Sequence, residues 1–212
     1  MLLCASSWAQ ITGITISPKL GKFMSDHPQA EKILTNAFSN AFSKKTVGLY
    51  YFYSYDESQP RSFHYYPDNA GWPEVVLCVQ ENQKPIDEFI TLLFETFNSK
   101  SEGGFTNLAQ EASLGTISKE QFAKEVVRYE FETTKNTRVT LLTLKFEKKE
   151  IKESDYYSIF IACPTNFDDF LSYSKKVSQN RDPMKEYELK YDSLRKMYID
   201  SNSSSNSVAP KN

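Results

Sequence analysis

An apolar strand followed directly by an amphipathic helix is the feature that most constrains the fold of this chain. Residues 74–80, EVVLCVQ, form an apolar run of strand length. Pro85 suits the first position of a helix. After it, apolar residues recur at helical spacing, namely Ile86, Phe89, Ile90, Leu93 and Phe97. We therefore expect a central strand and then a helix, Pro85 to Asn98, whose apolar side packs on a sheet.

The other segments predict a mixture of strands and helices. β-branched and aromatic residues predict strands at 11–16, 47–55, 62–66 and 156–163, with 47–55 and 62–66 forming a hairpin around a turn at 56–60. Helical spacing predicts helices at 28–43, 118–134 and 166–177, with Asp26, Ser118 and Thr165 as N-caps. Residues 138–146 fit a continued helix or a strand, and helix is favoured. Residues 18–23 are expected to be a connection, and the Gly103-Gly104 pair to end the helix that starts at Pro85.

These elements predict an α+β fold, with a small, mostly antiparallel sheet packed against amphipathic helices and a helical C-terminus. We expect one domain over residues 10–200. Its last helix carries apolar residues with heptad spacing, namely Met184, Tyr187, Tyr191, Leu194 and Tyr198. This stripe is expected to dock on the body of the domain. Residues 201–212 are rich in Ser and Asn and are expected to be disordered.

Composition excludes several classes of function. The chain has 25 Lys and Arg against 27 Asp and Glu, and this balance argues against nucleic acid as a partner, because phosphate binding requires a basic surface. Its 7 glycines are not clustered into a phosphate-binding loop. We expect no cofactor and no metal. No run is long and apolar enough for a transmembrane segment.

The N-terminus indicates export. Residues 1–9, MLLCASSWA, are apolar and end in small residues, as the remnant of a signal peptide would. A basic segment before the apolar part is missing, and a buried strand is the alternative. We expect a secreted or periplasmic protein, and otherwise a cytoplasmic one. In an oxidising compartment Cys78 and Cys163 could pair in a disulfide, but each lies in an apolar, strand-like run, so two buried free thiols are the other interpretation.

The order of strands and helices resembles that of zincin-type metallopeptidases, over about residues 47–134. In that family the helix after the central strand carries the motif H-E-x-x-H, in which two His bind zinc and the Glu acts as general base. The matching residues here are Phe94, Glu95 and Asn98. Phe cannot bind zinc and Asn is a poor ligand, so only the general base remains.

The resemblance implies a scaffold that has lost its metal. Glu125 and Glu130, on the following helix, stand where a third ligand would lie. Glu95, Asn98 and Glu130 are therefore vestigial candidates, and we expect no metal site. Without a zinc site, the simplest expectation is that Glu95 points to water, because it lies opposite Ile86 on the helix. No GxSxG or other intact catalytic motif is present, so an enzyme is not expected.

Aromatic residues in the predicted strands are candidates for binding. Tyr51, Tyr53 and Tyr55 share one face of their strand, and tyrosine is enriched at interfaces. His64 lies in the next strand. We therefore expect a non-catalytic binding domain, monomeric or weakly dimeric, with a protein or peptide partner. The alternatives are a hydrolase or peptidase that uses Glu95, and a structural envelope or assembly subunit that pairs through the heptad stripe.

Overall fold

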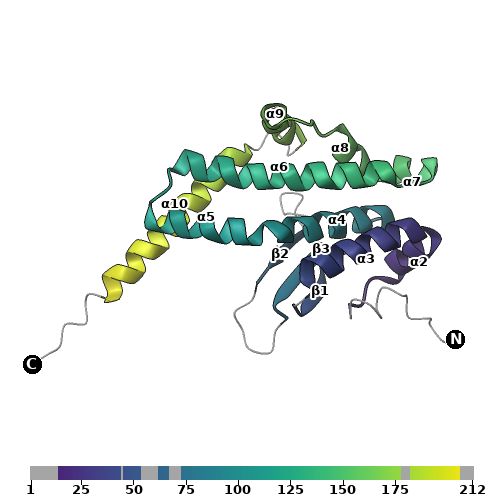
Figure 1. Ribbon diagram of the computed structural model, residues 1–212, viewed down its shortest axis with the longest axis horizontal. Coiled ribbons are helices and arrows are strands. Elements are labelled where there is room, and N and C mark those ends of the chain that lie inside the picture. Colours follow the sequence, from purple (N-terminus) through teal and green to yellow (C-terminus); the bar gives the residue numbers. More distant parts are fainter. Residues whose placement is uncertain (1–13, 44, 54–61, 67–72, 178–181, 206–212) are drawn as a thin grey trace, which may run out of the picture. The chain divides into compact units, whose positions relative to one another are not determined.

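The computed structural model describes residues 14–43, 45–53, 62–66, 73–177 and 182–205. The chain divides into two compact units (Figure 1). The first unit contains the residues up to 100 and residues 133–162, and the second contains 101–132 and the chain from 163 onward. The expected domain, 10–200, is thus built from two compact units. The expected signal remnant, Tyr55 and the turn at 56–60 lie outside the described residues.

Three strands and six helices define the first unit within the part of the chain described. They are α2 Pro18–Asp26, α3 Pro28–Phe42, β1 Val47–Phe52, β2 Ser62–Tyr65, β3 Val75–Gln80, α4 Pro85–Asn98, α7 Lys148–Glu153, α8 Tyr157–Ala162 and the second half of α6. Helix α6, Lys119–Thr143, supplies its first half to the second unit. The second unit also holds α5 Glu102–Leu114, α9 Phe167–Val177 and α10 Pro183–Ser205, and the short 3-10 turn Ser99–Ser101 leads into α5. The predicted α+β class and helical C-terminus are confirmed.

The sheet is mixed, and the predicted hairpin is wrong. Its strand order is β1-β3-β2, with β1 parallel to β3 and β2 antiparallel to it. The prediction that β3 is central is confirmed. Five of its six residues are buried, so it is covered on both faces and has a neighbour on either side. The chain therefore inserts β3 between the two strands that sequence proximity would have paired.

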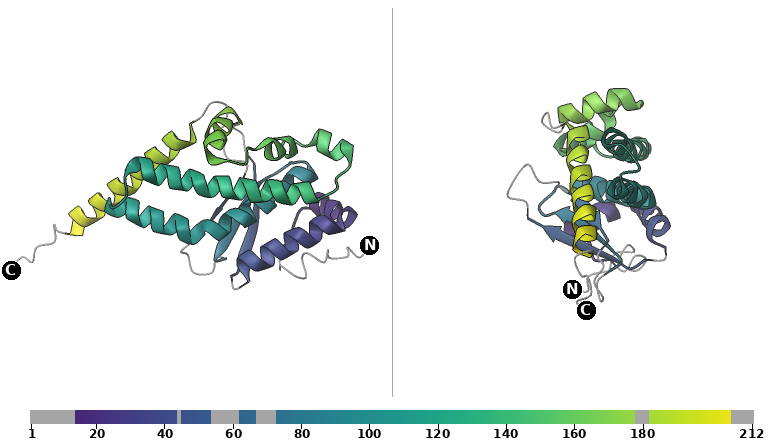
Figure 2. Two further views of the ribbon diagram at one scale, coloured as in Figure 1. Left: turned by 45° about the horizontal axis from the view of Figure 1, so that its top comes forward. Right: turned by 90° about the vertical axis from the view of Figure 1, so that its left-hand side faces the viewer.

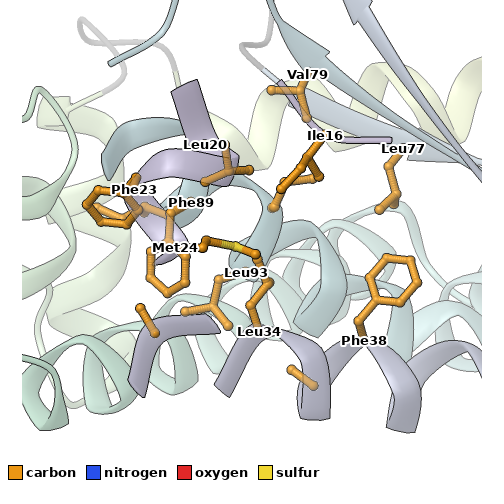
Figure 3. Packing of buried hydrophobic residues seen from close by; sticks show 14 of the residues in the cluster. Ile16, Leu20, Phe23, Met24, Leu34, Phe38, Leu77, Val79, Phe89 and Leu93 are labelled. Carbon is orange, nitrogen blue, oxygen red and sulfur yellow. The ribbon is translucent and has the colours of Figure 1, made fainter. Parts of the chain in front are cut away.

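Helices α2, α3 and α4 cover one face of the sheet (Figure 3). Leu77 and Val79 project from β3 into a core that includes Leu20 of α2, Leu34 of α3 and Phe89 of α4, all of them fully buried. Burying a side chain of this size stabilises the fold by about 1.5–3 kcal/mol. This core fixes the position of α4, which carries the buried polar groups described below.

Two segments of the first unit are helices where other structures were expected. Residues 18–26 form α2, because Ser17 caps the helix by accepting a hydrogen bond from the Leu20 amide at 3.1 Å and Pro18 occupies its first turn. The predicted cap Asp26 instead pairs with Lys22 at 2.6 Å, and His27 precedes α3 without a side-chain cap.

Residues 157–162 form helix α8, so the predicted strand at 156–163 is wrong. Short apolar runs fit either structure, and here the deciding signal is the Ser154 hydroxyl, which accepts the Tyr157 amide at 2.8 Å. Arg138 of α6 donates to the carbonyl of Ile161 at 3.0 Å and thereby satisfies the end of this helix.

Within the second unit, Gly103 and Gly104 lie inside α5 and do not end a helix. The terminating residue is Gly115, whose φ of 74° is the left-handed conformation typical of a residue just past a helix end. Ser118 accepts the Gln121 amide at 3.1 Å, which confirms it as the cap of α6. Helix α6 continues to Thr143, as favoured. Asn166, rather than Thr165, caps α9.

The heptad stripe of α10 packs within the second unit (Figure 2). Tyr187, Tyr191 and Leu194 contact a cluster formed by α5 and α6, and the Tyr191 hydroxyl donates to the carbonyl of Ile117 at 3.0 Å. Residues 201–205 continue α10, in contrast to the disorder expected there. None of the described helices has the length and apolarity that crossing a lipid bilayer requires.

Candidate functional site

Three carboxylates of helix α4 are buried. Asp87 is 2% exposed, Glu88 4% and Glu95 3%. Burial of a charged group is costly unless the group is hydrogen-bonded, and each of these accepts hydrogen bonds from segments distant in the sequence. Asp87 and Glu88 lie in the first turn of α4, where a carboxylate also interacts favourably with the positive end of the helix dipole. Their long-range bonds are the more important role.

Glu95 binds β2. Its Oε1 accepts the Ser62 hydroxyl at 2.6 Å, and its Oε2 lies 2.8 Å from Nδ1 of His64. The expectation that Glu95 points to water is therefore wrong. Although it lies opposite Ile86 on the helix, strand β2 covers that side, so α4 is enclosed on nearly all sides. The carboxylate selects the imidazole tautomer that carries a proton on Nδ1.

The other positions matched to the zincin motif have partners of their own. Phe94 packs on the ring of Phe160, with centroids 5.6 Å apart, and Asn98 accepts the Thr133 hydroxyl at 3.4 Å. In the second unit, Glu130 accepts the hydroxyl of Tyr187, and Glu125 lies 3.7 Å from Arg128 on the protein surface. Among the residues described, no group of three or more His, Cys, Asp and Glu could hold a metal ion.

Cys78 lies on β3, and the field of Glu95 reaches it. Burial, and secondarily the charge of Glu95, raise the pKa of its thiol. A raised pKa makes a thiol a poorer nucleophile. Cys78 and Cys163 are both buried free thiols, which is one of the two alternatives that the sequence left open.

Glu88 joins three segments near the start of α4. Its Oε1 accepts the hydroxyl of Tyr51 at 2.5 Å, and its Oε2 accepts the hydroxyl of Ser17 at 2.7 Å. The Ser17 amide in turn donates to the Tyr51 oxygen at 2.8 Å. Burial raises the pKa of Glu88, while its bonds to Tyr51 and Ser17 oppose the rise. Burial and the nearby Glu88 also raise the pKa of Tyr51, so the phenol stays protonated as a donor.

This network borders an open cleft of about 410 Å³. The cleft lies where the parallel strands β1 and β3 end and where α2 and α4 begin, and its lining includes Ser17, Lys19, Tyr51, Tyr53, Glu81, Asn82, Gln83 and Glu88. Its volume is within the range of small-ligand sites. The carboxyl ends of parallel strands are the usual place for ligands in α/β sheets.

The structure brings some of the predicted binding residues together and separates others. Tyr51 and Tyr53 both line the cleft, as their shared strand face predicted. His64 instead contacts Glu95 and is not among the residues of the cleft.

Sequence reasoning missed Ser17, Glu81 and Glu88 as members of this site. The Ser17-Pro18 pair was the signal for a helix start at the cleft. No local signal places Glu88 beside Tyr51, which lies 37 residues away in the chain. No protein-family model, curated protein or solved structure matches this chain.

Proposed function

We propose that the protein is a non-catalytic binding domain whose ligand occupies the cleft at the carboxyl ends of β1 and β3. The observation that carries this proposal is the cleft itself, about 410 Å³ in volume, with the hydrogen-bonded Glu88–Tyr51–Ser17 network at its border. Binding sites pair such concave shape with a few convergent polar groups. Because the network fixes three side chains, the cleft is preorganised for a ligand.

A non-catalytic role is supported by the surroundings of Glu95. Each of its oxygens already accepts a hydrogen bond from β2, and the nearby thiol of Cys78 is held protonated. As parts of the same proposal, the protein is exported to the periplasm or secreted, and its first unit is a zincin-like scaffold without zinc ligands. Residues 1–9 support export, and the helix that places Glu95 after a central strand supports the scaffold.

A hydrolase is the second candidate, favoured by the Glu95–His64 pair. A carboxylate that holds Nδ1 of a histidine is how many enzymes orient a general base. This candidate requires a nucleophile or a metal-bound water near His64. Metal analysis of the purified protein distinguishes the two. If the wild type holds stoichiometric zinc and has a hydrolytic activity, and Glu95→Gln loses both, the protein is a hydrolase and the binding proposal is wrong.

The binding proposal is tested by screening the full chain against fragments of mixed charge, using ligand-observed NMR. A variant with an obstructed cleft supplies the control. Thr15 is exposed and lines the cleft, so Thr15→Trp obstructs it without entering the core. Ser25→Trp adds the same side chain at an exposed position of α2 outside the cleft. We expect hits that survive Ser25→Trp and disappear in Thr15→Trp. Hits unaffected by Thr15→Trp, or none at all, contradict the proposal.

A further inference from the structure

We propose that the cleft takes an organic cation, an ammonium or guanidinium group on a short chain. This inference rests on the proposed function, because it names the ligand class of the same cleft. It follows from the charges that line the cleft, from one unsatisfied carboxylate oxygen and from the two tyrosines.

The ionisable residues of the lining favour a positive ligand. They are Glu81, Glu88 and Lys19, which give a formal charge of 1 − 2 = −1. Both oxygens of Glu88 accept hydrogen bonds from the protein, so Glu81, rather than Glu88, is the carboxylate left to meet a ligand. Lys19 is exposed where α2 begins, and its ammonium can turn toward solvent.

The carboxylate of Glu81 can accept a further hydrogen bond. Its Oε2 is buried without a partner among the residues described, and a buried acceptor without a donor destabilises the protein. The backbone of Glu81 is fixed, because its amide donates to the carbonyl of Phe52 at 2.7 Å. The two oxygens of a carboxylate are equivalent, and Glu81 lines the cleft, so its side chain can offer an oxygen to a ligand there. A ligand N–H would then satisfy it with a charge-assisted hydrogen bond.

The turn after β3 and the end of β1 complete the site. Asn82 has a φ of 65°, a left-handed conformation that asparagine adopts more readily than most residues. This turn places Glu81, Asn82 and Gln83 together along the cleft. Tyr53 is 61% exposed and Tyr51 is half-buried, and both border the same space. Tyrosine rings attract cations through their π faces.

The test compares three probes with the same four-carbon chain, butylammonium, butanol and butyrate. Each is titrated into the ¹⁵N-labelled full chain while backbone amide shifts are recorded. We expect butylammonium to shift the amides of residues 15–17, 19 and 80–83, and the other two probes to leave them unchanged. Glu81→Gln keeps the shape and removes the charge, and should weaken butylammonium binding about tenfold. Lys19→Met removes the competing charge and should strengthen it.

Glu153→Gln is the matched control, since Glu153 is an exposed carboxylate of the same unit outside the cleft. It should leave binding unchanged. Butanol that binds as tightly as butylammonium would overturn the inference, and so would butyrate binding that Lys19→Met abolishes. With either result the cleft would still be a binding site, so the proposed function would stand while the cation inference fails. If none of the three probes shifts these amides, the cation inference fails, and the fragment screen decides separately on the proposed function.

Discussion

Nδ1 of His64 lies 2.8 Å from Oε2 of Glu95, and this contact joins edge strand β2 to the buried helix α4. The Ser62 hydroxyl reaches the other oxygen of the same carboxylate. A single side chain of α4 therefore serves two donors of β2, a strand that pairs within the described sheet only with β3. This arrangement makes Glu95 important for stability whether or not it has any chemical role.

Replacement of Glu95 by leucine should destabilise the protein by at least about 2 kcal/mol, because it leaves two donors buried without an acceptor. Glu95→Gln keeps one acceptor oxygen and should cost less. Urea denaturation followed by circular dichroism measures both variants. A leucine variant as stable as the wild type would show that Ser62 and His64 find other partners or water.

The ionisation of Glu88 should make stability fall as the pH rises. Burial raises its pKa above the ordinary 4.5 in the folded protein. A group whose pKa is raised on folding stabilises the fold while it is protonated. That contribution is therefore complete below pH 4.5 and is lost as the pH rises through the higher, folded-state pKa.

Glu88→Gln removes this titration and serves as the comparison. The free energy of unfolding of the wild type, minus that of Glu88→Gln, should decrease as the pH rises above 4.5. The pKa of Asp87 is also raised, chiefly by burial, but Asp87 is present in both proteins and cancels in the difference. A difference that grows with pH would mean that the hydrogen bonds from Tyr51 and Ser17 outweigh burial.

Two adjacent glycines of α5 should respond oppositely to alanine. A Cβ at Gly103 would meet nothing within 4 Å, so Gly103→Ala should stabilise the helix by about 0.5–1 kcal/mol. A Cβ at Gly104 would overlap the phenol of Tyr129, whose ring packs on Phe105 at a centroid distance of 5.1 Å. Gly104→Ala should therefore cost about 1 kcal/mol or more. Thermal unfolding of both variants measures the contrast, and equal shifts in Tm would refute the packing of Tyr129.

The docking of α10 is tested by aspartate at two leucines of the same helix. Leu194 packs on the cluster of α5 and α6, whereas Leu189 is 67% exposed. Leu194→Asp should cost roughly 2 kcal/mol, because it removes a packed side chain and brings a charge to its place. Leu189→Asp should be nearly neutral. Sedimentation of both variants also addresses assembly, since a wild-type dimer dissociated by Leu194→Asp alone would favour pairing through the heptad stripe.

Sequence patterns predicted those helices and strands that are determined within a single segment of the chain. Helix α4 was predicted with its observed bounds, because a proline start and a regular apolar stripe act within a single segment. The apolar β3 was recognised as central for the same reason. Pairing of the strands was not predictable in this way, because the parallel register of β1 with β3 depends on packing between residues 28 positions apart, such as Val47 and Val75.

In the candidate site, too, some residues were predictable from local pattern and others were not. Tyr51 and Tyr53 were predicted to share a face and to bind, and both line the cleft. The acidic residues that would decide the ligand, Glu81 and Glu88, carried no distinguishing pattern. Glu88 lies in the first turn of a helix, where a carboxylate is common for electrostatic reasons alone, and only the tertiary structure brings Ser17 and Tyr51 to it.

The three carboxylates of α4 also bear on the order in which the first unit folds. Asp87 accepts bonds from Ser154 and the amides of Asp155 and Tyr156, while Glu88 and Glu95 reach back toward the N-terminus. Each contact closes a loop of 31 to 71 residues, so its entropic cost must be met before it stabilises anything. The sequence of α4 favours a helix by itself, but its carboxylates can form these hydrogen bonds only after the segments before and after α4 have packed against it. We therefore expect the burial of these carboxylates to be a late step of folding, and a partly folded molecule to leave them in contact with water.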